Sequence, residues 1–141
     1  MSLESLRIYQ DARIASEKVY EVVSSWSEFD RSSLGSQLVR SADSICHNIS
    51  EGYGRSATGE RLQFMFYAEG SLQEARGQLS LASDRGLIDA SYAMELSFLL
   101  KRLSISIIEF CHTLLEREPT YRGSYRKRVE DRRKWRTKPK P

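Results

Sequence analysis

Apolar residues recur at spacings of three and four along most of the chain, the spacing of residues on one face of a helix. This pattern predicts four helices, over residues 5–28, 34–51, 59–83 and 89–116. The loop between the second and third predicted helices is short, so these two should be antiparallel neighbours. We therefore expect an all-α chain, with an antiparallel up-and-down four-helix bundle at residues 1–118 and a tail at residues 119–141.

The third and fourth predicted helices have regular apolar seams, and that of the third is close to a heptad stripe. The seam of the third helix consists of Leu62, Met65, Ala68, Leu72, Ala75, Leu79 and Ala82. The seam of the fourth consists of Tyr92, Leu96, Leu99, Leu103, Ile107, Phe110 and Leu114. These two seams are the main part of the predicted core.

Both helices also have apolar or glycine residues outside these seams, where a bundle helix is usually polar. They are Phe66, Gly70, Gly77 and Leu81 in the third helix, and Met94, Phe98 and Ile105 in the fourth. Glycine inside a helix costs about 1 kcal/mol relative to alanine, so two on one face suggest that another helix comes close. Exposing the larger side chains together would create an apolar patch unusual for a soluble monomer. The sequence therefore predicts that copies of the chain bury this face between them, as a homo-oligomer.

The second predicted helix has a core stripe and a separate polar stripe. The core stripe is Leu34, Leu38, Ala42, Ile45 and Ile49, and the polar stripe is Arg40, Ser44, His47, Asn48 and Glu51, followed by Arg55. Ser32 or Ser33 is a plausible N-cap for this helix. Gly52 and Gly54 are expected to end it, because glycine readily adopts the left-handed conformation of many C-terminal caps.

The polar stripe has two interpretations, and the sequence leaves both open. In the first it is a binding surface, where Arg40 and Arg55 contact phosphate and Ser44 and Asn48 add hydrogen bonds. In the second it is a structural network between helices or subunits. Glu51 then pairs with an arginine, and Asn48 satisfies backbone groups near the glycine loop.

The same stretch resembles a known family. The resemblance is carried by Arg40, Ala42, Ser44-Ile45, Asn48-Ile49, Glu51-Gly52 and Gly54-Arg55, followed by Phe64, Ala68 and Gly70-Ser71. These residues look like the bacterial four-helix-bundle family that includes the proteins encoded in intervening sequences of 23S ribosomal RNA genes. They are similar, more distantly, to the accessory variability proteins of diversity-generating retroelements. The resemblance covers roughly residues 5–116.

The resemblance implies more than the residues alone. It implies a closed ring of subunits, a homopentamer, and an association with RNA, with 23S ribosomal RNA or the ribosome as the partner. The more distant similarity implies an alternative, a protein–protein adaptor ring for a nucleic-acid enzyme such as a reverse transcriptase.

The net charge of +3 conceals an uneven distribution. Residues 119–141 contain 10 Lys and Arg against Glu130 and Asp131, a net charge of +8, which leaves −5 for the rest of the chain. An acidic body with a basic tail suggests that the tail binds a polyanion.

The tail combines these cations with Tyr121, Tyr125 and Trp135, and its cationic run continues to Lys138 and Lys140. Lys and Arg release counterions when they meet phosphate, and aromatic rings stack on unpaired bases. The predicted nucleic-acid-binding residues are Arg40, Arg55, Arg122, Arg126, Lys127, Arg128, Arg132, Arg133, Lys134, Trp135 and Arg136. The alternative is a solubilising, disordered end. The hydrophobic content is too low for the tail to fold alone, so we expect it to extend the last helix or to stay mobile.

Other chemistry receives little support from the sequence. Cys46-His47 and Cys111-His112 are adjacent pairs, and neighbouring helical residues point about 100° apart, so neither pair presents both side chains to one zinc ion. We expect core cysteines, no metal and no cofactor. Because no nucleophile–base spacing or phosphate-binding glycine loop is present, we expect a non-enzymatic protein. The N-terminus lacks the apolar region of a signal peptide, and a cytoplasmic location is expected.

Overall fold

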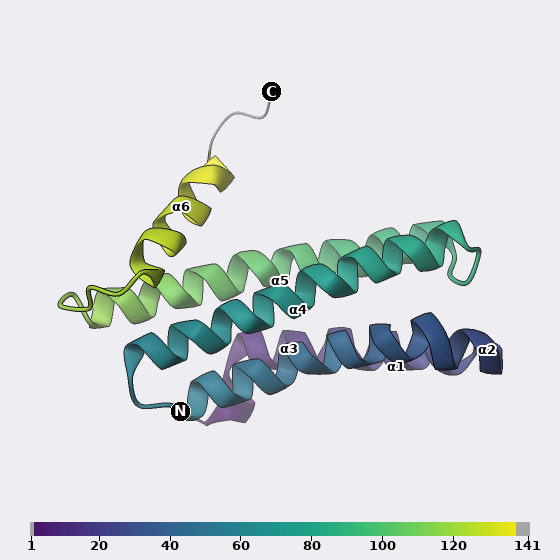
Figure 1. Ribbon diagram of the computed structural model, residues 1–141, viewed down its shortest axis with the longest axis horizontal. Coiled ribbons are helices and arrows are strands. Elements are labelled where there is room, and N and C mark those ends of the chain that lie inside the picture. Colours follow the sequence, from purple (N-terminus) through teal and green to yellow (C-terminus); the bar gives the residue numbers. More distant parts are fainter. Residues whose placement is uncertain (1, 138–141) are drawn as a thin grey trace.

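The computed structural model describes residues 2–137, and within that range every regular element is helical. Four long helices lie side by side along the length of the molecule (Figure 1). They are α1 (Arg7–Ser24), α3 (Ser36–Gly54), α4 (Thr58–Asp84) and α5 (Ala90–Arg117). The short elements are the 3-10 turn η1 (Leu3–Ser5), α2 (Glu28–Asp30), the π-helical turn η2 (Arg31–Gly35) and a final helix α6 (Tyr125–Thr137). The all-α prediction is confirmed.

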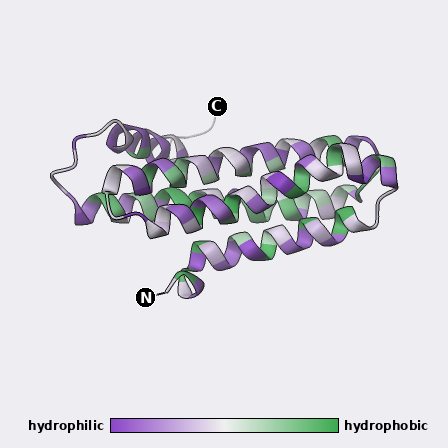
Figure 2. Cartoon of the chain, turned by 60° about the horizontal axis from the view of Figure 1, so that its bottom comes forward, coloured by the Kyte–Doolittle hydropathy of each residue, from purple (hydrophilic) through white to green (hydrophobic). Residues whose placement is uncertain are grey.

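The four long helices enclose one hydrophobic core. α3 packs on α1 and α4, and α5 packs on α4 and α1, so the contacts close around the core. Every member of the seam predicted for α4 is exposed by 1% or less. Figure 2 shows hydrophobic and hydrophilic residues alternating along the long helices, whereas α6 is mostly hydrophilic. Within residues 2–137 no helix is both long and apolar enough to cross a membrane.

The connection between α1 and α3 differs from the prediction. α1 ends at Ser24, four residues before the predicted end, and residues 28–35 are helical, since α2 and η2 continue directly into α3. Ser32 and Ser33 are not N-caps, because their hydroxyls donate to the carbonyl oxygens of Glu28 and Phe29, each at 2.7 Å. Bonds of this kind satisfy a serine hydroxyl inside a helix. The capping residue is Ser27, whose hydroxyl accepts from the Asp30 N–H at 3.3 Å.

Gly52 has a different role from the one predicted. α3 continues to Gly54, and Gly86 is the one glycine with a positive φ within residues 2–137. Neither Gly52 nor Gly54 therefore forms a left-handed cap. A Cβ atom at Gly52 would lie 2.8 Å from Met65 Cε and 3.1 Å from Phe64 Cβ, both on α4. Gly52 is needed because α4 comes close to α3 there, while a Cβ atom at Gly54 would meet nothing within 4 Å.

The outward face of α4 and α5 carries exposed apolar residues, as the sequence suggested. Met94 is 74% exposed and Phe98 62%, and Leu81 and Ile105 are also exposed. Cβ atoms added at Gly70 and Gly77 would meet nothing within 4 Å, so no part of the described chain approaches these glycines. Sequence reasoning missed a further exposed set on α1 and α2, formed by Ile14, Tyr20 and Phe29.

The tail neither extends α5 nor stays unstructured, so that prediction is wrong for residues 119–137. α5 ends at Arg117, and the chain turns before α6 begins at Tyr125 and packs on α5 and α4. The tail is too polar to fold alone, but Val129 gives it a contact with the core and is fully buried. Helices gain most of their stability from such packing. Lys138 and Lys140 lie outside the described residues.

Candidate nucleic-acid interface

α6 is attached to α4 and α5 by a small apolar and aromatic contact. Val129 joins the hydrophobic core, and the Tyr125 ring stacks on Phe66 with centroids 5.3 Å apart. The Arg128 guanidinium lies over the Phe66 ring at 4.3 Å and over the Tyr125 ring at 5.1 Å. Phe66, which the sequence assigned to an intersubunit face, is thus half-buried by the chain's own last helix.

Glu69 on α4 is the buried carboxylate that holds α6 in place. It is 5% exposed, forms an ion pair with Arg132 of α6, and accepts a hydrogen bond from the Ser104 hydroxyl of α5 at 3.1 Å. Burial by itself raises the pKa of Glu69, but the hydrogen bond and charge of Arg132 outweigh it, with smaller contributions from Gln73 and Ser104. The pKa of Glu69 is therefore lowered, and its ionised form favours the attachment of α6.

A second carboxylate, Glu109 on α5, binds the other end of α6. Its Oε1 atom accepts from Arg133 Nε at 3.1 Å and from Arg136 Nη2 at 2.5 Å. Burial acts to raise the pKa of Glu109, but the hydrogen bonds of Arg136 and Arg133 outweigh it and lower the pKa. Arg133 also lies 3.3 Å from His112 Nδ1. Three of the predicted RNA-binding arginines of α6 thus already have a carboxylate partner within the chain.

The remaining described cations of this region have other partners. Arg122 donates to the Pro119 carbonyl oxygen at 2.8 Å, and Arg126 donates to the carbonyl oxygens of Tyr121 and Glu118, each at 3.0 Å. Lys127 pairs with Asp131 of α6 itself at 2.8 Å.

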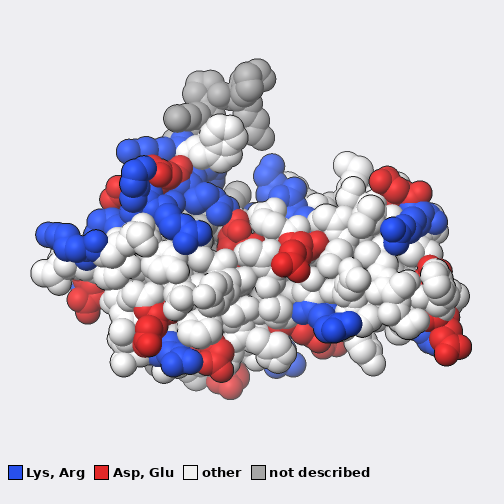
Figure 3. All heavy atoms as spheres, viewed as in Figure 1, with Lys and Arg blue, Asp and Glu red and all other residues white. Residues whose placement is uncertain are grey.

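Lys and Arg side chains gather over α6 and the turn before it, whereas the rest of the visible face mixes both signs (Figure 3). α6 contains seven Lys and Arg against two acids. Trp135, 71% exposed, belongs to the same helix. The structure therefore brings the predicted tail residues together on α6 and, for Arg122, on the turn before it.

Arg40 and Arg55 are not part of this cluster. Arg40 lies in the second turn of α3 and donates to the Ser36 hydroxyl at 2.8 Å. Arg55 follows the last residue of α3, pairs with Glu51 at 3.3 Å, and lies 5.0 Å over the Phe64 ring. At 1.5 Å per residue, about 22 Å of helix separates the two arginines, so they cannot contact one phosphate group together.

The polar stripe of α3 divides between two neighbouring helices. The hydroxyls of Ser44 and Ser71 are hydrogen-bonded at 2.9 Å, which links α3 to α4. Asn48 Nδ2 donates to the carbonyl oxygen of Ser44 at 2.8 Å and to its hydroxyl at 3.0 Å. Ser44 therefore links α3 to α4, while His47 faces the groove between α1 and α3. The structural interpretation placed Asn48 at backbone groups near the glycine loop, whereas its two hydrogen bonds go to Ser44, one turn earlier in α3.

Sequence reasoning missed the residues that receive α6. Glu69, Ser104 and Glu109 looked like ordinary polar positions between core residues. One signal was available: Glu69 follows Ala68 and Ser104 follows Leu103, so each polar residue is adjacent to a seam position. A carboxylate this close to the core needs a cationic partner, because an unpaired buried charge is costly.

The two Cys-His pairs do not form a metal site. Within residues 2–137 no three His, Cys, Asp or Glu side chains are grouped closely enough to hold a metal ion. Burial raises the pKa of the Cys46 thiol to about 11 and that of Cys111 to about 12. Both thiols are therefore protonated at neutral pH and are weak nucleophiles.

A comparison with models of protein families identifies the family of this chain. Residues 4–109 match the model of the 23S rRNA-intervening sequence protein family. The chain belongs to this family. The matched part of the chain includes α1, α3, α4 and most of α5, and it ends before α6 begins at Tyr125. A comparison with curated proteins finds no match to the chain.

Proposed function

We propose that this chain is a non-enzymatic, RNA-associated protein that binds RNA phosphates through α6, with 23S ribosomal RNA or the ribosome as its target. The observation that carries the proposal is a basic helix fixed to the bundle by Val129, Glu69 and Glu109. A cationic surface on a rigid element loses less conformational entropy on binding than a disordered tail would. The family description supports ribosomal RNA as the target.

The cations that contact RNA are those whose charge the chain does not neutralise. Within residues 2–137, the partners of Arg122 and Arg126 are carbonyl oxygens, and Arg128 lies on two aromatic rings. These three residues keep a full positive charge, whereas Lys127 is paired with Asp131. Arg132, Arg133 and Arg136, which face the carboxylates, mainly hold α6 in place.

Binding of this kind is electrostatic and reads little sequence. Phosphate contacts position a protein on a nucleic acid but do not discriminate bases. Trp135 adds stacking on an unpaired base, a contact worth about 1–3 kcal/mol that tolerates any base. The affinity should therefore fall steeply with salt.

Oligomerisation belongs to the same proposal. We propose that the four long helices form an antiparallel four-helix bundle that assembles into a homopentameric ring through the outward face of α4 and α5. Exposed Met94 and Phe98, together with the open surfaces at Gly70 and Gly77, support close packing of another subunit there. Several copies of α6 would then act together, and their effective concentration would strengthen weak single contacts.

A substitution pair tests the role of α6. In the Arg122→Gln/Arg126→Gln variant we expect weaker binding to a 23S ribosomal RNA fragment. The slope of log K against log salt should decrease by about 0.7–0.9 per lost phosphate contact. The matched control is Lys18→Gln/Arg85→Gln, which removes the same charge from exposed residues on other elements. Equal weakening in both variants would show that net charge, and not α6, determines binding.

The exposed apolar residues on the outward face of α4 and α5 also favour a second candidate, a protein–protein adaptor for a nucleic-acid enzyme such as a reverse transcriptase. Leu81, Met94, Phe98 and Ile105 are exposed apolar side chains of α4 and α5 that another protein could cover as readily as a second subunit. The adaptor candidate is favoured if the gene lies beside a reverse transcriptase gene and the protein leaves RNA unshifted in a gel. A gene inside a ribosomal RNA operon favours the first proposal.

A further inference from the structure

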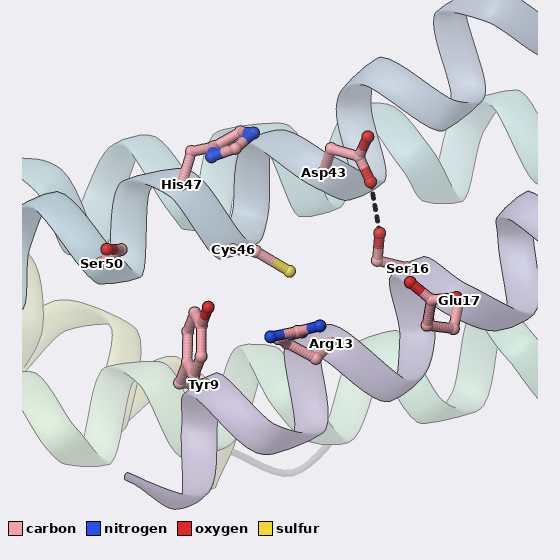
Figure 4. A pocket seen from close by; sticks show the side chains of 8 residues that line it. All are labelled: Tyr9, Arg13, Ser16, Glu17, Asp43, Cys46, His47 and Ser50. Atoms are coloured by element: carbon pink, nitrogen blue, oxygen red, sulfur yellow. Dashed lines mark hydrogen bonds between the residues drawn. The ribbon is translucent and has the colours of Figure 1, made fainter. Parts of the chain in front are cut away.

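A polar groove lies between α1 and α3, on residues that the RNA proposal does not use. Its volume is about 270 Å³, and four residues from each helix line it (Figure 4). This space is enough for a small metabolite and too small for most drug-sized ligands. The charge of the lining side chains changes along the groove. This order of charges indicates which kind of ligand the groove would bind.

The charged side chains occur in a fixed order. Glu17 of α1 and Asp43 of α3 lie at one end, with Asp43 accepting a hydrogen bond from the Ser16 hydroxyl. Arg13 lies in the middle, and its guanidinium points into the groove beside Cys46 (Figure 4). Tyr9 and Ser50 supply hydroxyls at the other end.

Arg13 and Glu17 are left available for a ligand. They are four residues apart on one helix, a spacing at which opposite charges often pair, yet within residues 2–137 they form no ion pair with each other. The contact of Arg13 is the Tyr9 ring, with its Cζ atom 5.9 Å from the centroid. The four-residue separation places their Cα atoms about 6 Å apart along α1.

Covalent and metal chemistry do not suit this groove. The Cys46 thiol faces it, but burial, aided by the charges of Asp43 and Glu17, raises its pKa to about 11 although Arg13 acts in the opposite direction. The thiol is therefore a neutral, weak hydrogen-bonding group at physiological pH. No group of residues that could hold a metal occurs in the part of the chain that the structure describes. The chemistry that suits the groove is therefore reversible binding of a polar molecule.

A simple anion does not match the charge of the groove. Arg13 offers one positive charge, whereas Asp43 and Glu17 offer two negative charges, so a phosphate would be repelled at the acidic end. A ligand with a carboxylate next to an ammonium group satisfies both ends. Guanidinium binds carboxylate in a two-pronged geometry, and hydrogen bonds between charged partners are the strong ones.

We propose that the groove between α1 and α3 binds a free α-amino acid. Arg13 holds the carboxylate, Glu17 and Asp43 hold the ammonium group, and the side chain extends toward the hydroxyls of Tyr9 and Ser50. These hydroxyls favour a polar side chain, such as an amide, that can both donate and accept. The site is independent of the RNA surface, because none of its residues belongs to α4, α5 or α6.

Titration of the ¹⁵N-labelled full chain with amino acids tests this inference by NMR. We expect millimolar L-glutamine, or another standard amino acid with a polar side chain, to shift the amide resonances of α1 and α3 and not those of α6. Two analogues of glutamine separate the contributions of its charged groups. Glutaramic acid lacks the ammonium group, 4-aminobutanamide lacks the carboxylate, and each should bind about tenfold or more weakly.

Substitutions at the groove complete the test. Arg13→Gln and Glu17→Gln should each weaken glutamine binding about tenfold or more, and Arg85→Gln, an exposed arginine after α4, should leave it unchanged. Arg13 and Glu17 are exposed, so the variants should retain the helical fold, which circular dichroism verifies. The inference is overturned if no standard amino acid shifts these resonances, if glutaramic acid binds as well as glutamine, or if the groove variants bind like the parent chain.

Discussion

Single residues decide how closely the helices of this protein approach each other. Gly52 and Gly54 look equivalent in the sequence, yet the structure gives them different surroundings. At Gly52 the space for a side chain is occupied by Met65, Phe64 and the Arg61 carbonyl oxygen, whereas at Gly54 it is open. The difference depends on the position of α4, which no local pattern around Gly52 reveals.

This difference predicts opposite effects of the same substitution. Gly52→Ala should destabilise the protein by about 1–3 kcal/mol, because its methyl group would lie 2.8 Å from Met65 Cε and 3.2 Å from the Arg61 carbonyl oxygen. Gly54→Ala should be neutral or should stabilise it by up to about 1 kcal/mol, because alanine is the better helix former. Urea unfolding of both variants measures the two changes. Equal stability of the two variants would show that α4 does not approach α3 closely at Gly52.

Residue patterns predicted the core better than the polar contacts. The seam from Leu62 to Ala82 could be predicted because helical spacing alone places its members on one face. The pairing of Glu69 with Arg132 could not, because it joins residues 63 positions apart on elements whose packing the sequence does not specify. Arg132 was predicted to bind nucleic acid, and in the structure it also serves as a structural cation.

At the scale of elements, α6 is the part of the chain whose stability depends most on charge. Its apolar anchor is small, and two carboxylates of α4 and α5, Glu69 and Glu109, bind three of its arginines. Composition alone predicted a tail that would extend α5 or stay mobile. It failed because it assessed the tail alone, whereas Val129 and Tyr125 pack on surfaces that α4 and α5 provide.

Acid should therefore release α6 before the rest of the fold. The folded-state pKa values of Glu69 and Glu109 are lowered from the ordinary value of 4.5. Their contribution is fully present above that value and is lost as the pH falls through the lowered values. Hydrogen exchange of α6 amides, compared at each pH with those of α4, should show α6 losing protection first below about pH 4.

The Glu69→Gln variant provides the control for this experiment. It should loosen α6 already at neutral pH, because the Arg132 charge then lacks its carboxylate, and its α6 should respond less to acid. If α6 and α4 of the parent chain lose protection together at every pH, the carboxylates do not control the attachment of α6.

For the whole molecule, the outward face of α4 and α5 determines whether the chain is a monomer or an oligomer. The sequence predicted this face from apolar residues outside the core seams, and the structure leaves Met94 and Phe98 exposed. The structure also removes Phe66 from the predicted intersubunit face, because α6 covers this residue. A single chain carries no record of its neighbours, so the subunit number stays a prediction of the family resemblance.

A mass measurement in solution tests the assembly. Light scattering should give about five times 16.3 kDa for the full chain, and Met94→Glu/Phe98→Glu should reduce the mass toward a single subunit, because charged side chains resist burial at an interface. Lys101→Glu, an exposed position on the same helix, provides the control for a change of charge. A parent chain that scatters as a single 16.3 kDa particle would refute the proposed ring.

We propose that α6 and the turn before it carry the RNA-binding surface. The most direct measurement is an RNA titration at low and at high salt, comparing the full chain with a chain that lacks residues 120–141 and keeps its helical signal. We expect the full chain to bind tightly at low salt and far more weakly at high salt, and the shortened chain to lose most binding at both. A shortened chain that still binds RNA at high salt would contradict it.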